Sequence, residues 1–171
     1  MSILYALWLI FPAYVANASA VIFGGGKPID FGKTWRGKPI LGEGKTWRGL
    51  AGGIFSGIAV GTIMNMIYPS FGEGMESLII LFALSLGALV GDMAESFLKR
   101  RLGRRRGEPW PVADQIDFLL GALLFSFIIS REWFVSNFTP YRILFLLIFT
   151  PLIHLATNLL AYVLKLKKVP W

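Results

Sequence analysis

The chain contains no cysteine and a single histidine among its 171 residues. Disulfide bonds and thiolate metal sites are therefore excluded, and one imidazole cannot build a histidine-based zinc site. Acidic residues are also scarce, with ten against 17 lysines and arginines and a formal net charge of +7. Because carboxylates are so few, each one that interrupts an apolar stretch requires a physical reason.

Apolar residues dominate the composition, at 55% of the chain with a mean hydropathy of +0.62. A bilayer core needs about 20 apolar residues for each helical crossing. Five stretches reach or approach that length, at residues 2–23, 50–68, 78–98, 114–130 and 142–164. They are too long and too uniformly apolar for barrel strands. The sequence therefore predicts an all-α fold, a polytopic membrane bundle of five transmembrane helices in one domain, residues 1–171.

The basic residues gather on one side of this predicted membrane domain. Fifteen of the 17 lie in the loop 24–49, in the connector 99–113 or after the fifth span. The positive-inside bias then predicts a cell-membrane protein with its amino terminus outside and its carboxyl terminus and two basic loops in the cytoplasm. Anionic membrane lipids are expected partners of such loops. No nucleic acid partner is expected, and a homodimer of this chain is a candidate assembly.

The first basic loop contains an internal echo, since residues 32–37 and 44–49 both read Gly-Lys-Thr-Trp-Arg-Gly. A P-loop is excluded because the glycine that this motif needs five positions upstream is a lysine in one copy and a proline in the other. Glycine backbone N–H groups, the charges of Lys45 and Arg48 and a following helix start still favour a phosphate. The alternative interpretation is a basic loop that lies against lipid head groups.

Acidic residues interrupt the third and fourth predicted spans at their cytoplasmic ends. The uncharged parts of these spans, residues 78–91 and 118–130, are too short to cross a bilayer alone. The acidic ends must therefore lie at the interface and face the bundle rather than lipid. Helical spacing puts two sets of side chains on single faces, namely Asp92, Glu95, Ser96 and Lys99 on one helix and Asp114 and Asp117 on the other.

Two helices joined by a short basic connector can present Asp92, Asp114 and Asp117 to a common point. Three carboxylates that lie so close need a positive charge between them. Oxygen ligands, in a chain without cysteine, indicate Mg²⁺, which usually serves phosphates. An acidic metal pocket inside a basic collar is what a nucleoside triphosphate requires. We therefore expect a Mg²⁺-dependent nucleotide site at the cytoplasmic face.

Residues 91–100, Gly-Asp-Met-Ala-Glu-Ser-Phe-Leu-Lys-Arg, and residues 114–117, Asp-Gln-Ile-Asp, resemble the signature of the CTP:phosphatidate cytidylyltransferases. The small size and the segments 28–33 and 41–49 are more similar to the archaeal branch of that family, the CDP-archaeol synthases. The resemblance implies transfer of CMP from CTP to the phosphate of an unsaturated archaeal ether lipid, 2,3-bis-geranylgeranyl-glycerol 1-phosphate. It also implies pyrophosphate as the second product and Mg²⁺ as the cofactor.

Site residues follow from this resemblance together with the charge pattern. The expected metal ligands are Asp92, Asp114 and Asp117, which with Lys45 form the expected catalytic set. The expected nucleotide contacts are Lys45, Thr46, Arg48, Glu95, Ser96, Lys99 and Arg100. The chain departs from the bacterial type, because the connector lacks a lysine-aspartate step and a His-Gly-Gly sequence. Asp92 and Glu108 are the two candidates to replace the missing connector aspartate.

Two other classes of protein compete with this interpretation. A small ion- or proton-coupled membrane transporter would also use carboxylates within its bundle, but it predicts acids near mid-membrane in several helices. A non-catalytic scaffold would bind anionic lipid through the basic loops and would not bind nucleotide with a divalent ion. The acidic residues cluster at one face beside the basic loops, which favours the enzyme.

Overall fold

The computed structural model describes residues 3–105 and 108–163. The remaining positions, which include Arg106 of the predicted connector and the basic residues after the fifth predicted span, lie outside the described residues. The described part contains helices and one two-stranded antiparallel hairpin. In chain order they are α1 (Tyr5–Ile22), β1 (Thr34–Trp35), β2 (Lys38–Pro39), α2 (Trp47–Ile67), α3 (Gly74–Arg101), α4 (Ala113–Ile129), α5 (Arg131–Asn137) and α6 (Pro140–Val163).

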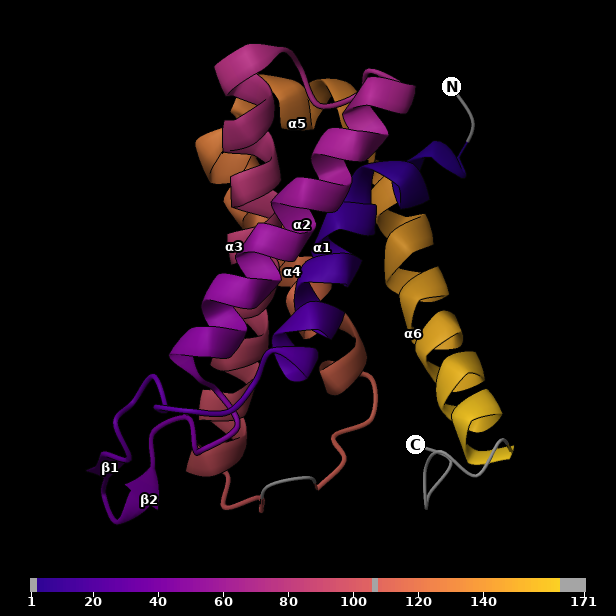
Figure 1. The fold of residues 1–171 in the computed structure, drawn as a ribbon. Helices are drawn as coiled ribbons and strands as arrows, with labels where there is room; N and C mark the ends of the chain where they lie inside the picture. The colour runs from indigo at the N-terminus through magenta and orange to yellow at the C-terminus, as the bar shows by residue number, and fades with distance from the viewer. Residues whose placement is uncertain (1–2, 106–107, 164–171) are drawn as a thin grey trace.

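The helices run along a common bundle whose two ends differ in character (Figure 1). The start of α1 and the short helix α5 lie at one end. The β1–β2 hairpin, the connector between α3 and α4, and the last turns of α6 lie at the opposite end. The loop 24–49 and the connector are therefore neighbours in space, as the charge pattern predicted.

Three of the described helices, α1, α2 and α3, are long and apolar enough to cross a membrane. A fourth crossing is available if α5 and Pro140–Ile153 of α6, which meet at a bend of 81°, act as one broken span. Helix α4 has 17 residues and packs along α3. The predicted helical bundle is therefore present, while the count of five crossings stays a prediction.

Helix α5 was not expected from the sequence, which predicted a loop between residues 130 and 142. The segment is helical because it buries large aromatic side chains that a loop would leave exposed. Trp133 and Phe134 are both buried, and their rings contact Phe138 at centroid distances of 5.6 and 5.1 Å. The Trp133 indole N–H donates to the Ser70 carbonyl at 2.8 Å, which ties α5 to the α2–α3 turn.

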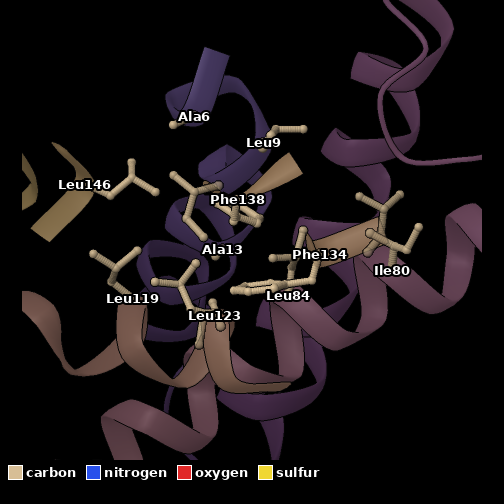
Figure 2. Packing of buried hydrophobic residues seen from close by; sticks show 14 of the residues in the cluster. Ala6, Leu9, Ala13, Ile80, Leu84, Leu119, Leu123, Phe134, Phe138 and Leu146 are labelled. Atoms are coloured by element: carbon tan, nitrogen blue, oxygen red, sulfur yellow. The ribbon is translucent and has the colours of Figure 1, made fainter. Parts of the chain in front are cut away.

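The apolar core runs from the end of the bundle that contains α5 to the second turn of α4, where Phe118 and Leu119 are fully buried. Leu9, Leu84 and Phe134 are among the buried side chains that converge there (Figure 2). They come from the first turns of α1, the early part of α3 and helix α5. Asp117 is the residue before Phe118, so the polar site borders this core directly.

Glycines allow α2 to lie directly against its neighbours. Gly53, Gly57 and Gly61 are buried at four-residue spacing, so they form one face of the helix. A Cβ atom at Gly53 would lie 2.7 Å from the Ala16 carbonyl oxygen of α1, and one at Gly61 would overlap Leu81 of α3. Small residues at such spacing let helix backbones approach closely in a membrane protein.

A second glycine contact brings the backbones of α3 and α4 together. A Cβ atom at Gly91 would overlap the carbonyl oxygen of Asp117, and one at Gly121 would overlap the carbonyl oxygen of Gly87. The obstructing atoms belong to the backbone and cannot rotate away. Asp92 follows Gly91 directly, so this contact holds Asp92 and Asp117 at the same level of the bundle.

Substitution of Gly121 tests the backbone contact. A methyl group in Gly121→Ala would meet the Gly87 carbonyl and lie 2.8 Å from the Gly91 Cα atom. Because the helices must separate to admit it, we expect the free energy of unfolding to fall by about 1–3 kcal/mol. Thermal unfolding in detergent, followed by circular dichroism, measures the change. The control is Leu120→Ala, whose side chain is 48% exposed, and equal stability of both variants would contradict the contact.

Candidate active site

A polar pocket of about 290 Å³ lies at the hairpin end of the bundle. Every site residue predicted from the sequence lines it, apart from Thr46 and Arg48. The full lining consists of Leu41, Gly42, Gly44, Lys45, Asp92, Glu95, Ser96, Lys99, Arg100, Asp114 and Asp117. Loop 24–49, α3 and α4 all contribute, so segments distant in the sequence meet here as the spacing argument expected.

Lys99 joins the acidic groups of the two helices. Its ammonium nitrogen lies 3.0 Å from Glu95 Oε1 on α3 and 2.6 Å from Asp114 Oδ1 on α4. The second oxygen of Asp114 accepts from the Trp110 backbone N–H at 3.0 Å. Lys99 and Glu95 are buried, and a buried charge is tolerated only when it is paired. This cluster therefore fixes the start of α4 against the end of α3.

Lys45 reaches the pocket from the loop and pairs with Asp92. Its ammonium nitrogen lies 2.5 Å from Asp92 Oδ2. The next residue, Thr46, is the N-cap of α2, and its hydroxyl accepts from the Gly49 backbone N–H at 3.1 Å. The cap fixes where α2 begins. In this structure Thr46 therefore positions Lys45 rather than lining the polar pocket, and Arg48 is exposed on the first turn of α2.

Asp30, which sequence reasoning did not single out, organises the loop that carries Lys45. One of its carboxylate oxygens accepts from the Gly32 N–H at 3.0 Å, and the other accepts from Leu41 and Gly42 at 2.9 Å each. Burial raises the pKa of Asp30, but these backbone donors outweigh burial and hold that pKa below its usual value. The sequence signal was an aspartate two residues before a glycine, which is typical of an Asx turn.

The β1–β2 hairpin is fastened to α3 by Arg101. Its guanidinium donates to the carbonyl oxygens of Trp35 at 2.6 Å and Lys38 at 3.1 Å, and also to that of Pro39. The same group lies 5.2 Å from the ring centroids of both Trp35 and Phe97. The first copy of the repeated hexapeptide thus forms a docked hairpin, whereas the second copy starts α2. Repetition in sequence did not produce repetition in structure.

Only one of the two candidates for the missing connector aspartate lines the pocket. Asp92 lines the pocket and faces Lys45. Glu108 instead lies 3.5 Å from Arg104 and accepts from the Arg105 backbone N–H, on the exposed side of the connector. The structure therefore favours Asp92.

The donors in the pocket suit Mg²⁺ in chemistry, because they are carboxylate oxygens. Asp117 interacts electrostatically with Asp92, Glu95 and Lys45. Across residues 3–105 and 108–163, however, no three acidic or histidine side chains are grouped tightly enough to hold an ion by themselves. Mg²⁺ is usually held by one or two carboxylates, with waters and substrate phosphates completing its shell. The three-aspartate ligand set stays a prediction, and Asp92 and Asp117 are its two members outside the Lys99 cluster.

Comparisons with known proteins agree with the signature. The family model described as CarS-like CDP-archaeol synthase matches residues 1–171. This chain belongs to the CarS-like CDP-archaeol synthase family. A CDP-archaeol synthase of Methanosarcina mazei is 48% identical, with 94% of this chain and 99% of the relative covered. One of Pyrococcus furiosus is 49% identical, with 99% and 98% covered.

A solved structure also matches, described as that of an intramembrane enzyme for archaeal membrane lipids biosynthesis. Its TM-score is 0.79 at 39% identity, and the match covers 92% of this chain and 94% of the other. The resemblance to the CDP-archaeol synthases and the membrane-protein fold are therefore confirmed. The transporter alternative receives no support from any of these relatives.

The Asp30 contacts predict a pH-dependent loop. Since the folded pKa of Asp30 is lowered, its stabilisation is complete above the unfolded value of about 4 and disappears as pH falls through the lower folded value. Asp30→Asn cannot accept from both sides and should speed backbone hydrogen exchange in residues 28–42 at neutral pH. Comparison with the wild type at decreasing pH should show this difference shrink below about pH 4 and vanish below the folded pKa of Asp30.

The control for this comparison is Glu73→Gln, which alters an exposed carboxyl group at the opposite end of the bundle. Exchange in residues 28–42 should be the same for this variant and the wild type at every pH. If Asp30→Asn also exchanged like the wild type at pH 7, the carboxylate would not organise the loop.

Proposed function

We propose that this chain transfers CMP from CTP to the phosphate of an unsaturated archaeal ether lipid, 2,3-bis-geranylgeranyl-glycerol 1-phosphate. The observation that carries the proposal is the polar pocket, which carboxylates of two helices line together with Lys45, Lys99 and Arg100, in a membrane enzyme of the CDP-archaeol synthase family. Lysines paired with carboxylates supply the positive charge that a metal-bound triphosphate requires.

The reaction is a single displacement at phosphorus. An oxygen of the lipid phosphate forms a bond to the α-phosphorus of CTP, and the bond from that phosphorus to the oxygen bridging the α- and β-phosphates breaks. The bridging oxygen leaves with the electron pair as part of pyrophosphate, and the products are CDP-archaeol and pyrophosphate. A phosphate monoester is already ionised at neutral pH, so neither a general base nor a covalent enzyme intermediate is needed.

The cations of the pocket would bind the triphosphate. Lys45 and Lys99 are held in place by Asp92 and Asp114 before any nucleotide arrives, at 2.5 and 2.6 Å. Their positions are therefore set in advance, which is the condition under which a charge stabilises a transition state efficiently. Phosphate oxygens would replace the carboxylates as partners of these lysines. The negative charge that develops on pyrophosphate would then face Lys99 and Arg100.

Mg²⁺ belongs to the same proposal, with Asp92 and Asp117 as its first ligands and Asp114 as the third. When bound, the ion would neutralise phosphate charge and orient the α-phosphate. Release of Lys45 to the triphosphate would free the Asp92 carboxylate for this role. The proposal is supported by the carboxylate oxygens of the pocket and by the presence of both Asp92 and Asp117 in its lining.

The proposed topology follows the same charges. Five crossings, with the amino terminus outside, would put the pocket at the cytoplasmic face, where CTP is made. Support comes from the loop 24–49 and the connector, whose basic residues lie at the same end of the bundle (Figure 1). A homodimer is compatible with this topology but is not required by it, because one chain supplies the whole pocket.

Replacement of one carboxylate tests the proposed chemistry. Asp117→Asn keeps the size of the side chain but removes its negative charge, so we expect formation of CDP-lipid to fall about a hundredfold or more. Radiolabelled CTP, offered with ether-linked and ester-linked lipid phosphates and Mg²⁺, measures the product, whose mass identifies it. Glu132→Gln, an exposed change on α5, is the control and should retain activity. Unchanged activity of Asp117→Asn would overturn the metal assignment.

A further inference from the structure

A second cavity of about 350 Å³ adjoins the polar pocket. The two share Gly44, Lys45 and Asp92, so the Lys45–Asp92 ion pair stands between them. The rest of the second cavity is built from the end of α1, the glycines that follow it, Ile29 and Glu43 of the loop, the N-cap and first turn of α2, and two residues of α3. We call it the α1–α2 cavity. Thr46, a predicted nucleotide contact, also lines it, and the sequence motifs assign no lipid contact there.

The two cavities differ in the number of their cations. The polar pocket contains three, Lys45, Lys99 and Arg100, beside four carboxylates, and several cations match the several negative charges of a triphosphate. The described lining of the α1–α2 cavity contains one cation, the shared Lys45, and two carboxylates, those of Asp92 and Glu43. The number of cations therefore favours the triphosphate in the polar pocket, and Lys45 is the cation that a phosphate in the second cavity would contact.

The α1–α2 cavity is also the more apolar of the two. Val21, Leu50, Leu89 and Met93 are among its lining residues. Asn17 adds one amide that has no hydrogen-bond partner among the described residues. A mostly apolar wall with few polar groups is typical of a ligand site, and it suits a ligand that is itself partly apolar.

The same cavity reaches the outer surface of the bundle. Val21 lines it and is nevertheless 81% exposed, and its neighbour Ile22 is 80% exposed. In a membrane enzyme, apolar side chains exposed at this level face lipid. A lipid could therefore enter past the end of α1 without crossing the charged pocket.

We propose that the α1–α2 cavity receives the glycerol phosphate end of the acceptor lipid, with Lys45 contacting both substrates and Asn17 contacting the glycerol region. This inference rests on the proposed function. A lipid phosphate oxygen in this cavity would form its bond to the α-phosphorus of CTP beside Lys45. The bond to the bridging oxygen would break on the other side, and pyrophosphate would leave into the polar pocket. In an in-line displacement the attacking and leaving oxygens lie on opposite sides of the phosphorus. Two cavities on opposite sides of the Lys45–Asp92 ion pair would provide one side for each oxygen.

The test separates the Michaelis constants of the two substrates. Val21→Trp adds bulk at an exposed position on the rim of the cavity, and we expect the KM for the lipid phosphate to rise about tenfold. Asn17→Ala removes one hydrogen-bonding group, and we expect that KM to rise about three- to tenfold. For both variants, the KM for CTP and the Kd for CTP with Mg²⁺, measured without lipid, should stay within about twofold of the wild type.

The matched control is Ile22→Trp, which adds the same bulk at the next position, equally exposed but outside the cavity lining. Its constants should equal those of the wild type. If Val21→Trp and Asn17→Ala raised the KM and Kd for CTP instead, the cavity would hold the nucleoside and the inference would be overturned. If Val21→Trp and Asn17→Ala left the KM for the lipid phosphate unchanged, the inference would also be overturned. The proposed function would still stand, because the wild type would remain active. A wild type that forms no CDP-lipid would overturn the proposed function and this inference together.

Discussion

The candidate site depends on one contact, the backbone approach of α3 to α4. Gly91 has no room for a Cβ atom because the carbonyl oxygen of Asp117 occupies that place. The residue that follows this glycine is Asp92, and the carbonyl belongs to a second pocket carboxylate. Helix packing and site geometry are therefore set by the same residues. Small residues let helices pack closely in a membrane, where apolar side chains gain little by leaving lipid.

Close approach of α3 and α4 brings several carboxylates together, and lysines neutralise most of their charge. Carboxylates within a membrane bundle are costly unless they are paired. Lys99, from α3 itself, pairs with Glu95 and Asp114, while Lys45 arrives from a loop and pairs with Asp92. The loop is thus part of the site, and Asp30 is important because it holds that loop in shape. The same lysines would bind the phosphates of the nucleotide. Each lysine would thus pair with a carboxylate in the empty site and with a phosphate in the occupied one.

Local periodicity was enough to predict much of this arrangement. Apolar length indicated most of the helices, and helical spacing put Asp92, Glu95 and Lys99 on one face, because both depend only on neighbours in the chain. The docked hairpin and helix α5 depend instead on distant partners. Arg101 binds carbonyl groups of the hairpin across more than sixty positions of the chain, and Trp133 is buried against the α2–α3 turn. Spacing could not reveal those contacts, nor that Thr46 would cap a helix.

The central claim, that carboxylates from two helices act at one spot, is tested most directly by combining substitutions at Asp92 and Asp117. Residues that act as a unit are strongly non-additive, so loss of either one removes most of what loss of both removes. The measurement is kcat/KM for CDP-lipid formation in Asp92→Asn, Asp117→Asn and the double variant. The account predicts that the double variant is hardly slower than the slower single variant. Losses that multiply would show that the two carboxylates act independently and would contradict it.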